Sequence, residues 1–453
     1  MSPYTLRGCG GVDSATGANF LLTTPEGKLL VDCGLVQGSN FAMQENRDSF
    51  PYDPKEILFL LVTHAHMDHI GRIPKLVKEG FNGVIYSTIE TKELAALMLD
   101  DAYSLITREA RESGHEPLYE KTDVVQALNL WKTIPYHTRT DLTKHISIYL
   151  KDAGHVLGSS IIEMTLKDVQ KKIAFTGDLG NSPTPLLQNT EFVTDADYMI
   201  MESVYGDRNH EPKNIRDERL KWILNEAINR NGTVVIPAFS LERTQVILYE
   251  INELVESKAI KSVPVFLDSP LAIRVTEVYR RHSEDFNEKI KSQIAGGDDI
   301  FDFPGLRIIK NPDESNGIHS IPGAKIIIAG SGMSVGGRVL SHEAFYLADP
   351  NATILLVGYQ VPGSLGRHIE ERASKVTVNG APVKVAAHIE KISGYSSHKD
   401  SNGLVDFVSH AKKLKQIFIA MGENKSAAYL AQRIRSEVGT NALVMEKGKE
   451  YKL

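Results

Sequence analysis

Four side chains of metal-binding types lie close together in the stretch VTHAHMDHIGR. They are His64, His66, Asp68 and His69, and they follow an apolar run, residues 57–62, that is typical of a buried strand. His64 and His66 alternate at the strand end, so both can face one point, whereas Asp68 and His69 lie in the following turn and can reach a second point. Hydrolysis by two metal ions requires two such points about 3.5–4 Å apart. Imidazole with carboxylate suits zinc best, with manganese or iron as alternatives. The spacing therefore predicts a metal centre.

Two further stretches are candidates to complete this centre. DAGHVLGSS puts His155 in a glycine-flanked loop between two expected strands, and FTGDLG puts Asp178 at a strand end, where a carboxylate could bridge two ions. Alone, each would more often be a turn residue, but the first cluster favours the functional interpretation. Asp32 ends the strand LLVD and suits a carboxylate that orients a metal ligand.

The expected strands and helices that must position these residues follow different patterns in different parts of the chain. In the N-terminal part, strands such as EILFLLVT alternate with amphipathic helices, and DVVQALNLWKTI (residues 123–134) has helical spacing. From about Asn214, helices and strands alternate regularly, as in GTVVIPAF, TQVILYEINELVES and VPVFLD. Such alternation predicts a parallel sheet with crossover helices. A hairpin turning at Asn379-Gly380 follows.

Length, charge and cysteine content limit the possible domain organisation, partners and location of the protein. The chain has 453 residues, which favours two domains or one domain with a large insert. It has a net charge of −6, which argues against broad electrostatic binding to nucleic acid and leaves a short positive cleft or bound cations open. Its start resembles no secretory signal, and no apolar run approaches the ~18 residues of a membrane span. Two cysteines, Cys9 and Cys33, suit a reducing environment, so we expect a cytoplasmic protein that does not contact a membrane.

The motifs together resemble a known family. The HxHxDH stretch, the isolated histidine and the TGD aspartate are similar to those of the metallo-β-lactamase fold. In chain order, MESVYGDR, IPAFSLERTQ, LDSPLA, IAGSGMSVGGR, VGYQVPGSLGR and GYSSHKD resemble the β-CASP nucleases over nearly the whole chain. The resemblance implies an α/β fold, namely a metallo-β-lactamase αββα sandwich with an inserted β-CASP domain built on a parallel sheet. The expected boundaries are 1–202 for the first part of the sandwich, 203–369 for the insert and 370–453 for the completing part.

The resemblance also implies roles for individual residues. One ion would be held by His64, His66 and His155, and the other by Asp68 and His69, with Asp178 bridging the two. His398, in SSHKD, matches the general acid that protonates the leaving oxygen, and Glu202 matches the carboxylate that orients it. The implied catalytic set is therefore His398, Glu202, Asp68 and Asp178.

A glycine-rich stretch, GSGMSVGGR, is a weaker candidate for binding a substrate phosphate, because glycine-rich turns before helices are common. The candidate phosphate contacts are Ser331, Gly332, Gly337, Arg338 and Arg243. A solvated helix start is an equal alternative for Arg243. His368 matches no position of the family's catalytic residues, and we interpret it as structural.

One position departs from the family pattern. A histidine before Gly-Glu usually gives the second metal another ligand, but this chain reads QIFIAMGENKS and has Met421 there. A thioether is a poor zinc ligand beside imidazoles and carboxylates. We therefore expect the second ion to bind more weakly than the first.

The sequence favours a metal-dependent ribonuclease that hydrolyses single-stranded RNA in RNA processing or decay, as an endonuclease, and leaves an additional 5′-to-3′ exonuclease activity open. Its expected cofactor is Zn²⁺, one or two ions per chain, with Mn²⁺ as the alternative, and a homodimer is left open. Met421 keeps two other functions open: a nuclease on single-stranded DNA, and a catalytically weakened RNA-binding paralogue. The other intact motif residues argue against the paralogue.

Overall fold

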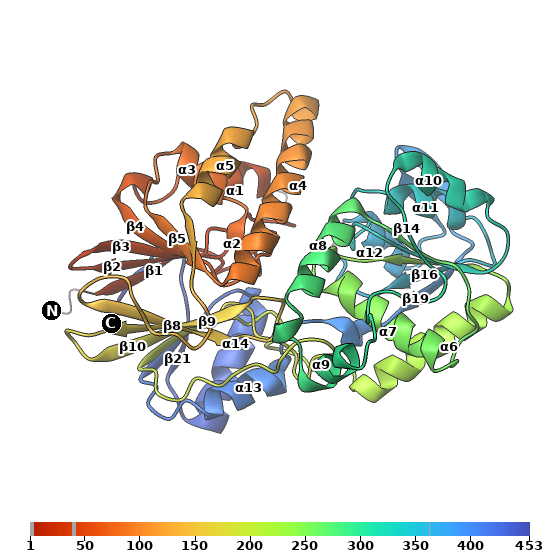
Figure 1. Cartoon of the computed structure of the whole chain (residues 1–453). Helices are drawn as coiled ribbons and strands as arrows, with labels where there is room; N and C mark the ends of the chain where they lie inside the picture. Colours follow the sequence, from red (N-terminus) through yellow and green to blue (C-terminus); the bar gives the residue numbers. More distant parts are fainter. Residues whose placement is uncertain (1–3, 39–41, 362) are drawn as a thin grey trace. The chain divides into compact units, whose positions relative to one another are not determined.

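The structure is a computed structural model that describes residues 4–38, 42–361 and 363–453. The chain divides into two compact units (Figure 1). The first unit combines residues 1–209 with residues 398–453, and the second unit comprises residues 210–397. The second unit is therefore an insertion between two parts of the first.

The first unit contains two seven-stranded sheets. The first sheet runs in the order β22 (Glu450–Lys452), β1 (Thr5–Gly10), β2 (Asn19–Thr24), β3 (Gly27–Val31), β4 (Ile57–Leu61), β5 (Val84–Ser87) and β6 (Trp131–Thr133). The second sheet runs in the order β21 (Ala442–Val444), β20 (Gln416–Ile419), β11 (Tyr198–Met201), β10 (Lys171–Phe175), β9 (Ser160–Leu166), β8 (Ile146–Asp152) and β7 (Thr140–Asp141).

The two sheets pack face to face through one apolar core. Leu22 and Leu29 of the first sheet belong to the same buried cluster as Ile148, Met164 and Phe175 of the second. Burial of such side chains contributes about 1.5–3 kcal/mol each. Alternating side chains point into this layer, as the period of two along a strand requires.

Helices cover the outer faces of the sandwich (Figure 1). The helices between strands of the first sheet are α2 (Met67–Ile70), α3 (Ile73–Lys78), α4 (Ile89–Ser113) and α5 (Lys121–Asn129), while α1 (Ala42–Arg47) follows β3. On the second sheet, α13 (Ser401–Ser409) and α14 (Asn424–Arg433) bury Leu404, Phe407 and Leu430 against Ala174 and Met199. The predicted αββα sandwich is thus confirmed.

The second unit is built on a parallel sheet of six strands in which every pair is parallel. The order is β14 (Leu306–Ile308), β13 (Val265–Asp268), β15 (Lys325–Ala329), β12 (Thr233–Pro237), β16 (Thr353–Leu356) and β19 (His388–Lys391). Its helices are α6 (Lys213–Asn229), α7 (Arg243–Glu256), α8 (Pro270–Arg281), α9 (Glu288–Ala295), α10 (Pro312–Gly317), α11 (Val339–Tyr346) and α12 (Leu365–Glu370). The predicted parallel sheet with crossover helices is present.

Two local expectations differ from the structure. Residues 131–133 form β6 instead of prolonging the helix, because Trp131 is buried and its Nε1 donates to Ser87 Oγ of β5 at 2.8 Å. The return to the first unit also comes at residue 398, later than the predicted residue 370. The reason is that β19 pairs with β16 and buries Ile389 in the core of the second unit, and the two-stranded hairpin β17 (Lys375–Val378) and β18 (Ala381–Lys384) precedes it. Among the helices that the structure describes, none combines the length and apolar character that a membrane span requires.

Candidate metal centre

The candidate site residues of the first unit lie at strand ends. Asp32 directly follows β3, and His64 follows β4 after two residues, and these two strands are parallel neighbours. Asp178 and Glu202 follow β10 and β11, which are also parallel neighbours. Because parallel strands end at the same edge of a sheet, side chains from distant parts of the sequence meet there.

The backbone of the HxHxDH loop is held by the loop after β3 and by Ala18, which directly precedes β2. Cys33 donates its N–H to the carbonyl of His69 at 2.8 Å, and Ala18 donates to the carbonyl of Asp68 at 2.9 Å. Gly34 sits so close to Asp68 that a Cβ atom at this position would lie 1.5 Å from its carbonyl oxygen. This close approach excludes any side chain at Gly34 and fixes the direction of the metal-binding turn.

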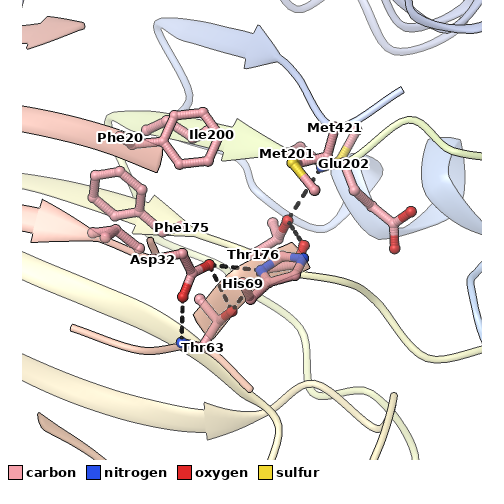
Figure 2. Close-up of a pocket in the computed structure, with 12 residues that line it drawn as sticks. Phe20, Asp32, Thr63, His69, Phe175, Thr176, Ile200, Met201, Glu202 and Met421 are labelled. Carbon is pink, nitrogen blue, oxygen red and sulfur yellow. Dashed lines mark hydrogen bonds and ion pairs between the residues drawn. The ribbon is translucent and has the colours of Figure 1, made fainter. Parts of the chain in front are cut away.

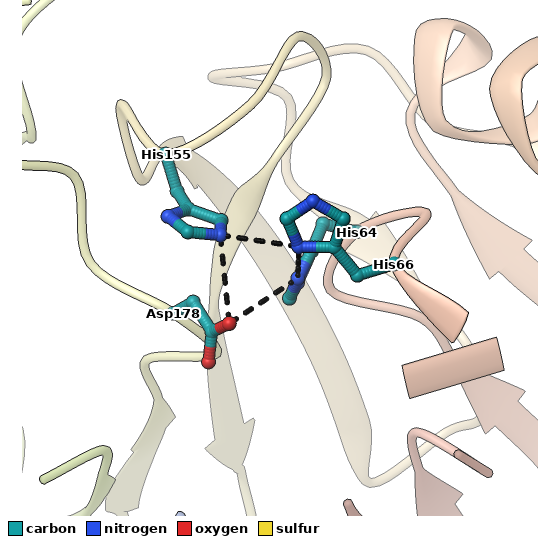
Figure 3. Close-up of side chains that lie close together, drawn as sticks. All are labelled: His64, His66, His155 and Asp178. Carbon is teal, nitrogen blue, oxygen red and sulfur yellow. Dashed lines mark hydrogen bonds and ion pairs between the residues drawn. The ribbon is translucent and has the colours of Figure 1, made fainter. Parts of the chain in front are cut away.

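Four of the predicted ligands converge (Figure 3). His64, His66, His155 and Asp178 each offer one ligand atom, and these atoms lie within 4.8 Å of one another. His66 Nδ1 lies 3.1 Å from His64 Nε2 and 3.3 Å from His155 Nε2. Asp178 Oδ2 lies 3.4 Å from His64 Nε2 and 3.5 Å from His155 Nε2. Ligands at the ~2.0–2.1 Å that zinc prefers would lie ~3.3–3.4 Å apart on a tetrahedron, so these spacings fit a single cation.

The protonation states of these four side chains also suit the binding of a cation. Burial, with the neighbouring histidines, lowers the pKa of His64 and holds the pKa values of His66 and His155 well below the usual range. Their nitrogen lone pairs are therefore free at neutral pH. Burial would raise the pKa of Asp178, but His69 and His398 outweigh it and hold that pKa well below its ordinary value. The cluster offers neutral imidazoles and one charged carboxylate, the donor set of a divalent cation.

A second candidate point lies beside His69. Its Nε2 atom is 3.4 Å from Asp178 Oδ1 and 4.0 Å from Asp68 Oδ2. Both His69 Nε2 and Asp178 Oδ1 are buried and lack a hydrogen-bond partner within the described part of the chain. Burial would lower the pKa of His69, but Asp178 and Asp32 raise it well above its usual range. A cation at this point would take the place of the Nε2 proton.

Asp32 contacts His69, the ligand candidate that it can orient (Figure 2). Asp32 Oδ2 lies 2.8 Å from His69 Nδ1, which turns Nε2 towards Asp178. Thr63 holds Asp32 in turn, because its N–H and its hydroxyl donate to the two carboxylate oxygens at 2.8 Å each. Sequence reasoning missed Thr63, although it directly precedes His64 in the motif. Carboxylates in this position fix ring orientation and raise ligand basicity.

Met421 packs in the apolar core at the edge of this region. It is buried in the cluster that contains Phe20, Phe175 and Ile200, and a small cavity lies between it and His69 (Figure 2). Its backbone N–H donates to the carbonyl of Gly11 at 2.6 Å. The position expected to supply another ligand is thus occupied by an apolar side chain.

His398 and Glu202 form a pair next to Asp178. His398 Nδ1 lies 3.2 Å from Glu202 Oε2 and 3.8 Å from Asp178 Oδ2. Glu202 is enclosed, whereas the His398 side chain is 23% exposed and so reaches solvent. Burial would lower the pKa of His398, but the carboxylates of Glu202 and Asp178 raise it to about 9. A protonated imidazole with one end on a buried carboxylate and the other accessible can act as a general acid.

Three further contacts place this pair, and sequence reasoning missed all of them. Leu179 donates its N–H to Glu202 Oε1 at 2.5 Å, and Lys399 donates its backbone N–H to the carbonyl of Leu179 at 2.7 Å. The ring of Tyr205 packs 6.1 Å from that of His398. Tyr205 stands in the MESVYGDR motif, so the motif itself was the available signal.

The candidate phosphate contacts lie in the second unit, where they have other partners. Arg338 Nη1 forms an ion pair with buried Asp268 at 2.5 Å and also donates to the carbonyl of Ile309 at 3.3 Å. Arg243 is buried, with its guanidinium 5.7 Å from the ring centre of Tyr395. The remaining three belong to the loop between β15 and α11, namely Ser331, Gly332 and Gly337. A phosphate role for the five residues stays a prediction.

The fold and the site define a metal-dependent hydrolase, with an αββα sandwich carrying histidine and aspartate ligands at its strand ends. Three family models match the chain: the metallo-beta-lactamase superfamily over residues 16–203, the Beta-Casp domain over 244–369, and the Zn-dependent metallo-hydrolase RNA specificity domain over 382–445. The chain belongs to the metallo-β-lactamase superfamily, in the group that carries a β-CASP domain. Membership of this superfamily implies that the protein binds a divalent metal ion.

Several known proteins are similar to the chain. Ribonuclease TTHA0252 of Thermus thermophilus is 33% identical over 88% of this chain and 89% of its own length. The RNase J-like protein of Methanocaldococcus jannaschii is 31% identical over 91% of this chain and 90% of its own length. Transcription termination factor FttA of Methanosarcina mazei is 29% identical over 96% of this chain and 69% of its own length. A crystal structure of a protein of unknown function from Enterococcus faecalis V583 shares the fold with a TM-score of 0.57 and 12% identity, covering 99% of this chain and 100% of the other.

Proposed function

We propose that the protein is a metal-dependent ribonuclease that hydrolyses phosphodiester bonds of single-stranded RNA in RNA processing or decay. The observation that carries the proposal is the convergence of His64, His66, His155 and Asp178 beside the pair of His398 and Glu202. The RNA specificity domain and the relatives named as ribonucleases support RNA as the substrate.

In this mechanism the three imidazoles and Asp178 would hold the first cation. A cation bound there would supply hydroxide from water near neutral pH and compensate charge on the phosphoryl oxygens. Asp178 is charged at neutral pH and is placed to be shared with a second point at Asp68 and His69. His398 protonates the leaving oxygen through Nε2, while Glu202 holds Nδ1 and balances the imidazolium charge. Hydrolysis then produces one new hydroxyl end and one phosphate end.

We propose Zn²⁺ as the resident ion, because three imidazoles with one carboxylate form a donor set that suits zinc. Mn²⁺ is the alternative that metal analysis must distinguish. We also propose that the first ion binds tightly and the second weakly, because the second point has only Asp68, His69 and Asp178 where Met421 gives no ligand. A cytoplasmic location and self-association remain predictions, and the two unpaired, buried cysteines support the former.

The testing experiment compares cleavage of matched 5′-labelled single-stranded RNA and DNA in the presence of Zn²⁺ or Mn²⁺. Asp178→Ala and His398→Ala serve as inactive controls, and the metal content of every preparation is measured. RNA cleavage that both variants lose would support the proposal. Cleavage of DNA alone would assign the protein to the DNA-acting nucleases. No cleavage of either substrate by metal-loaded protein would favour an RNA-binding role instead.

A further inference from the structure

Two segments of the first unit, one after Glu202 and one after His398, are joined by hydrogen bonds that the proposed chemistry does not use. The segment after Glu202, residues 203–209, is fixed at its start. The Ser203 hydroxyl donates to the carbonyl of Ala420 at 2.8 Å, and the Ser426 hydroxyl donates to the carbonyl of Ser203 at 2.6 Å. This segment is therefore tied to the residues around the end of β20.

Ser401 connects this segment to the one that follows His398. Its N–H donates to the carbonyl of Arg208 at 3.0 Å, and its hydroxyl donates to the carbonyl of Gly206 at 2.6 Å. Next to it, Asn402 donates its N–H to Asn209 Oδ1 at 3.1 Å. Ser401 is only 2% exposed, so water does not compete for these bonds.

Arg433, at the end of α14, sets the direction of the Ser401 hydroxyl. Its Nη1 donates to Ser401 Oγ at 2.7 Å, so the serine proton must point to the other neighbour, the carbonyl of Gly206. Glu437 holds the guanidinium with two contacts, at 2.7 and 3.0 Å. Two-point ion pairs of this kind fix a guanidinium in one orientation. The Ser401 hydroxyl thus accepts a hydrogen bond from Arg433 and donates one to the carbonyl of Gly206.

The Ser401 hydroxyl is not needed to start its helix. Asp400 is the N-cap of α13, and its carboxylate accepts the N–H of Gly403 at 2.9 Å. The hydroxyl of Ser401 instead leaves the helix and bonds to the segment after Glu202. Its role is therefore to join the two segments.

We propose that Ser401, oriented by Arg433, is a positioning residue that keeps His398 within reach of Glu202 and of the leaving oxygen. The inference rests on the proposed function, in which His398 is the general acid. Ser401 lies three residues after His398 and contacts a segment that begins one residue after Glu202. A displacement of about 1 Å between catalytic groups can reduce a rate strongly, so a bond that fixes the two backbones together affects proton transfer.

The test separates proton transfer from metal chemistry by changing the leaving group. RNA has a poor leaving oxygen that needs a proton, whereas p-nitrophenolate leaves without one, so bis(p-nitrophenyl) phosphate does not depend on the general acid. For Ser401→Ala we expect kcat on RNA to fall about tenfold or more, a part of the ~10²–10⁴-fold that a general acid contributes. Cleavage of bis(p-nitrophenyl) phosphate should change less than about twofold, and zinc content should not change. Ser409→Ala, in the same helix, is the matched control, because the partners that the described structure gives the Ser409 hydroxyl, the carbonyl of Asp406 and Nδ1 of His410, are local to this helix end.

A double-mutant cycle gives a second readout. If Ser401 acts through His398, then adding Ser401→Ala to His398→Ala causes no further loss on RNA. Arg433→Gln removes the guanidinium that orients the Ser401 hydroxyl, so it should also reduce cleavage of RNA but not of bis(p-nitrophenyl) phosphate. This second variant keeps the test valid if Ser401→Ala folds poorly. Equal losses on both substrates, or a further loss in the His398→Ala background, would overturn the positioning role. Wild-type protein that is loaded with metal and cleaves neither substrate would instead overturn the proposed function, and the inference with it.

Discussion

The Nδ1 atom of His398 lies 3.2 Å from Oε2 of Glu202, which leaves Nε2 as the ring nitrogen that can face a substrate. The two residues are almost two hundred positions apart in the sequence, and the whole second unit lies between them. Glu202 is buried, whereas the His398 side chain reaches solvent.

Asp178→Asn should remove both the tight metal site and the activity. The carboxylate lies within 3.5 Å of three imidazole nitrogens and balances the charge of a cation. We expect metal affinity and RNA cleavage each to fall at least about 10²-fold. Isothermal titration with Zn²⁺ and a single-turnover cleavage assay measure the two effects. Asp141→Asn, at an exposed carboxylate in the same sheet, is the control, and unchanged zinc affinity in Asp178→Asn would contradict the assignment.

Asp32→Asn should weaken metal binding without removing a ligand. Asp32 holds Nδ1 of His69, so the amide would leave the ring free to rotate or to change tautomer. Changes of this type typically cost about 10–100-fold in metal affinity or activity. We expect the effect on the second ion to exceed that on the first, because Asp32 contacts His69 directly but reaches His64 only through the Thr63 hydroxyl. If metal titration shows an equal loss of affinity for both ions, then Asp32 does not act mainly on the second site.

Met421→His should increase the amount of metal bound. The exchange places an imidazole at the position where the family pattern has a ligand, in the lining of the small cavity that His69 also lines. We expect the second ion to bind at least about tenfold more tightly, because one further side chain would bind it directly. Inductively coupled plasma measurements after dialysis should show a rise from about one towards two ions per chain. Met421→Leu preserves the apolar volume and is the control; the same stoichiometry in all three proteins would count against the weak second site.

The pH profile should have an alkaline limb that depends on His398. With its pKa raised to about 9 by the two carboxylates, His398 is protonated at neutral pH and loses its proton as the pH rises through that value. Cleavage of RNA should therefore fall by up to about tenfold per pH unit on the alkaline side. A bound cation compensates the same carboxylates, so the limb begins below pH 9 in the metal-loaded protein. The profile of His398→Ala should lack this limb, and a limb that persists in that variant must come from another group.

Arg338→Met should reduce stability more than RNA binding. The guanidinium is paired with buried Asp268, and His342 Nε2 contacts the same carboxylate at 2.7 Å. Removal of one partner leaves a buried charge, which we expect to cost roughly 2–3 kcal/mol of the free energy of unfolding. Denaturant unfolding measures this cost, and fluorescence anisotropy with labelled RNA measures binding. Lost RNA affinity at unchanged stability would restore the predicted phosphate contact.

Much of the fold could be predicted, because its signals are local. The apolar run 57–62, the alternation after Asn214 and the turn at Asn379-Gly380 each appear in the structure as the corresponding strand, parallel sheet and hairpin. Boundaries were less well predicted. The strand at residues 388–391 was not among the expected elements, because its pairing with β16 depends on a sheet edge formed by residues far away in the chain.

By itself, the sequence determined the chemical types at the site and their local spacing. His64, His66, Asp68 and His69 stand in one turn, and side-chain type alone limits what such a turn can bind. Only the tertiary structure decided which atoms meet. His155 and Asp178 approach His64 because strands from both sheets end at one edge, and Thr63, Leu179 and Ser401 became visible only through their hydrogen bonds. The physical reason is that side-chain chemistry belongs to each residue, whereas distances between residues far apart in sequence are set by the packing of the sheets.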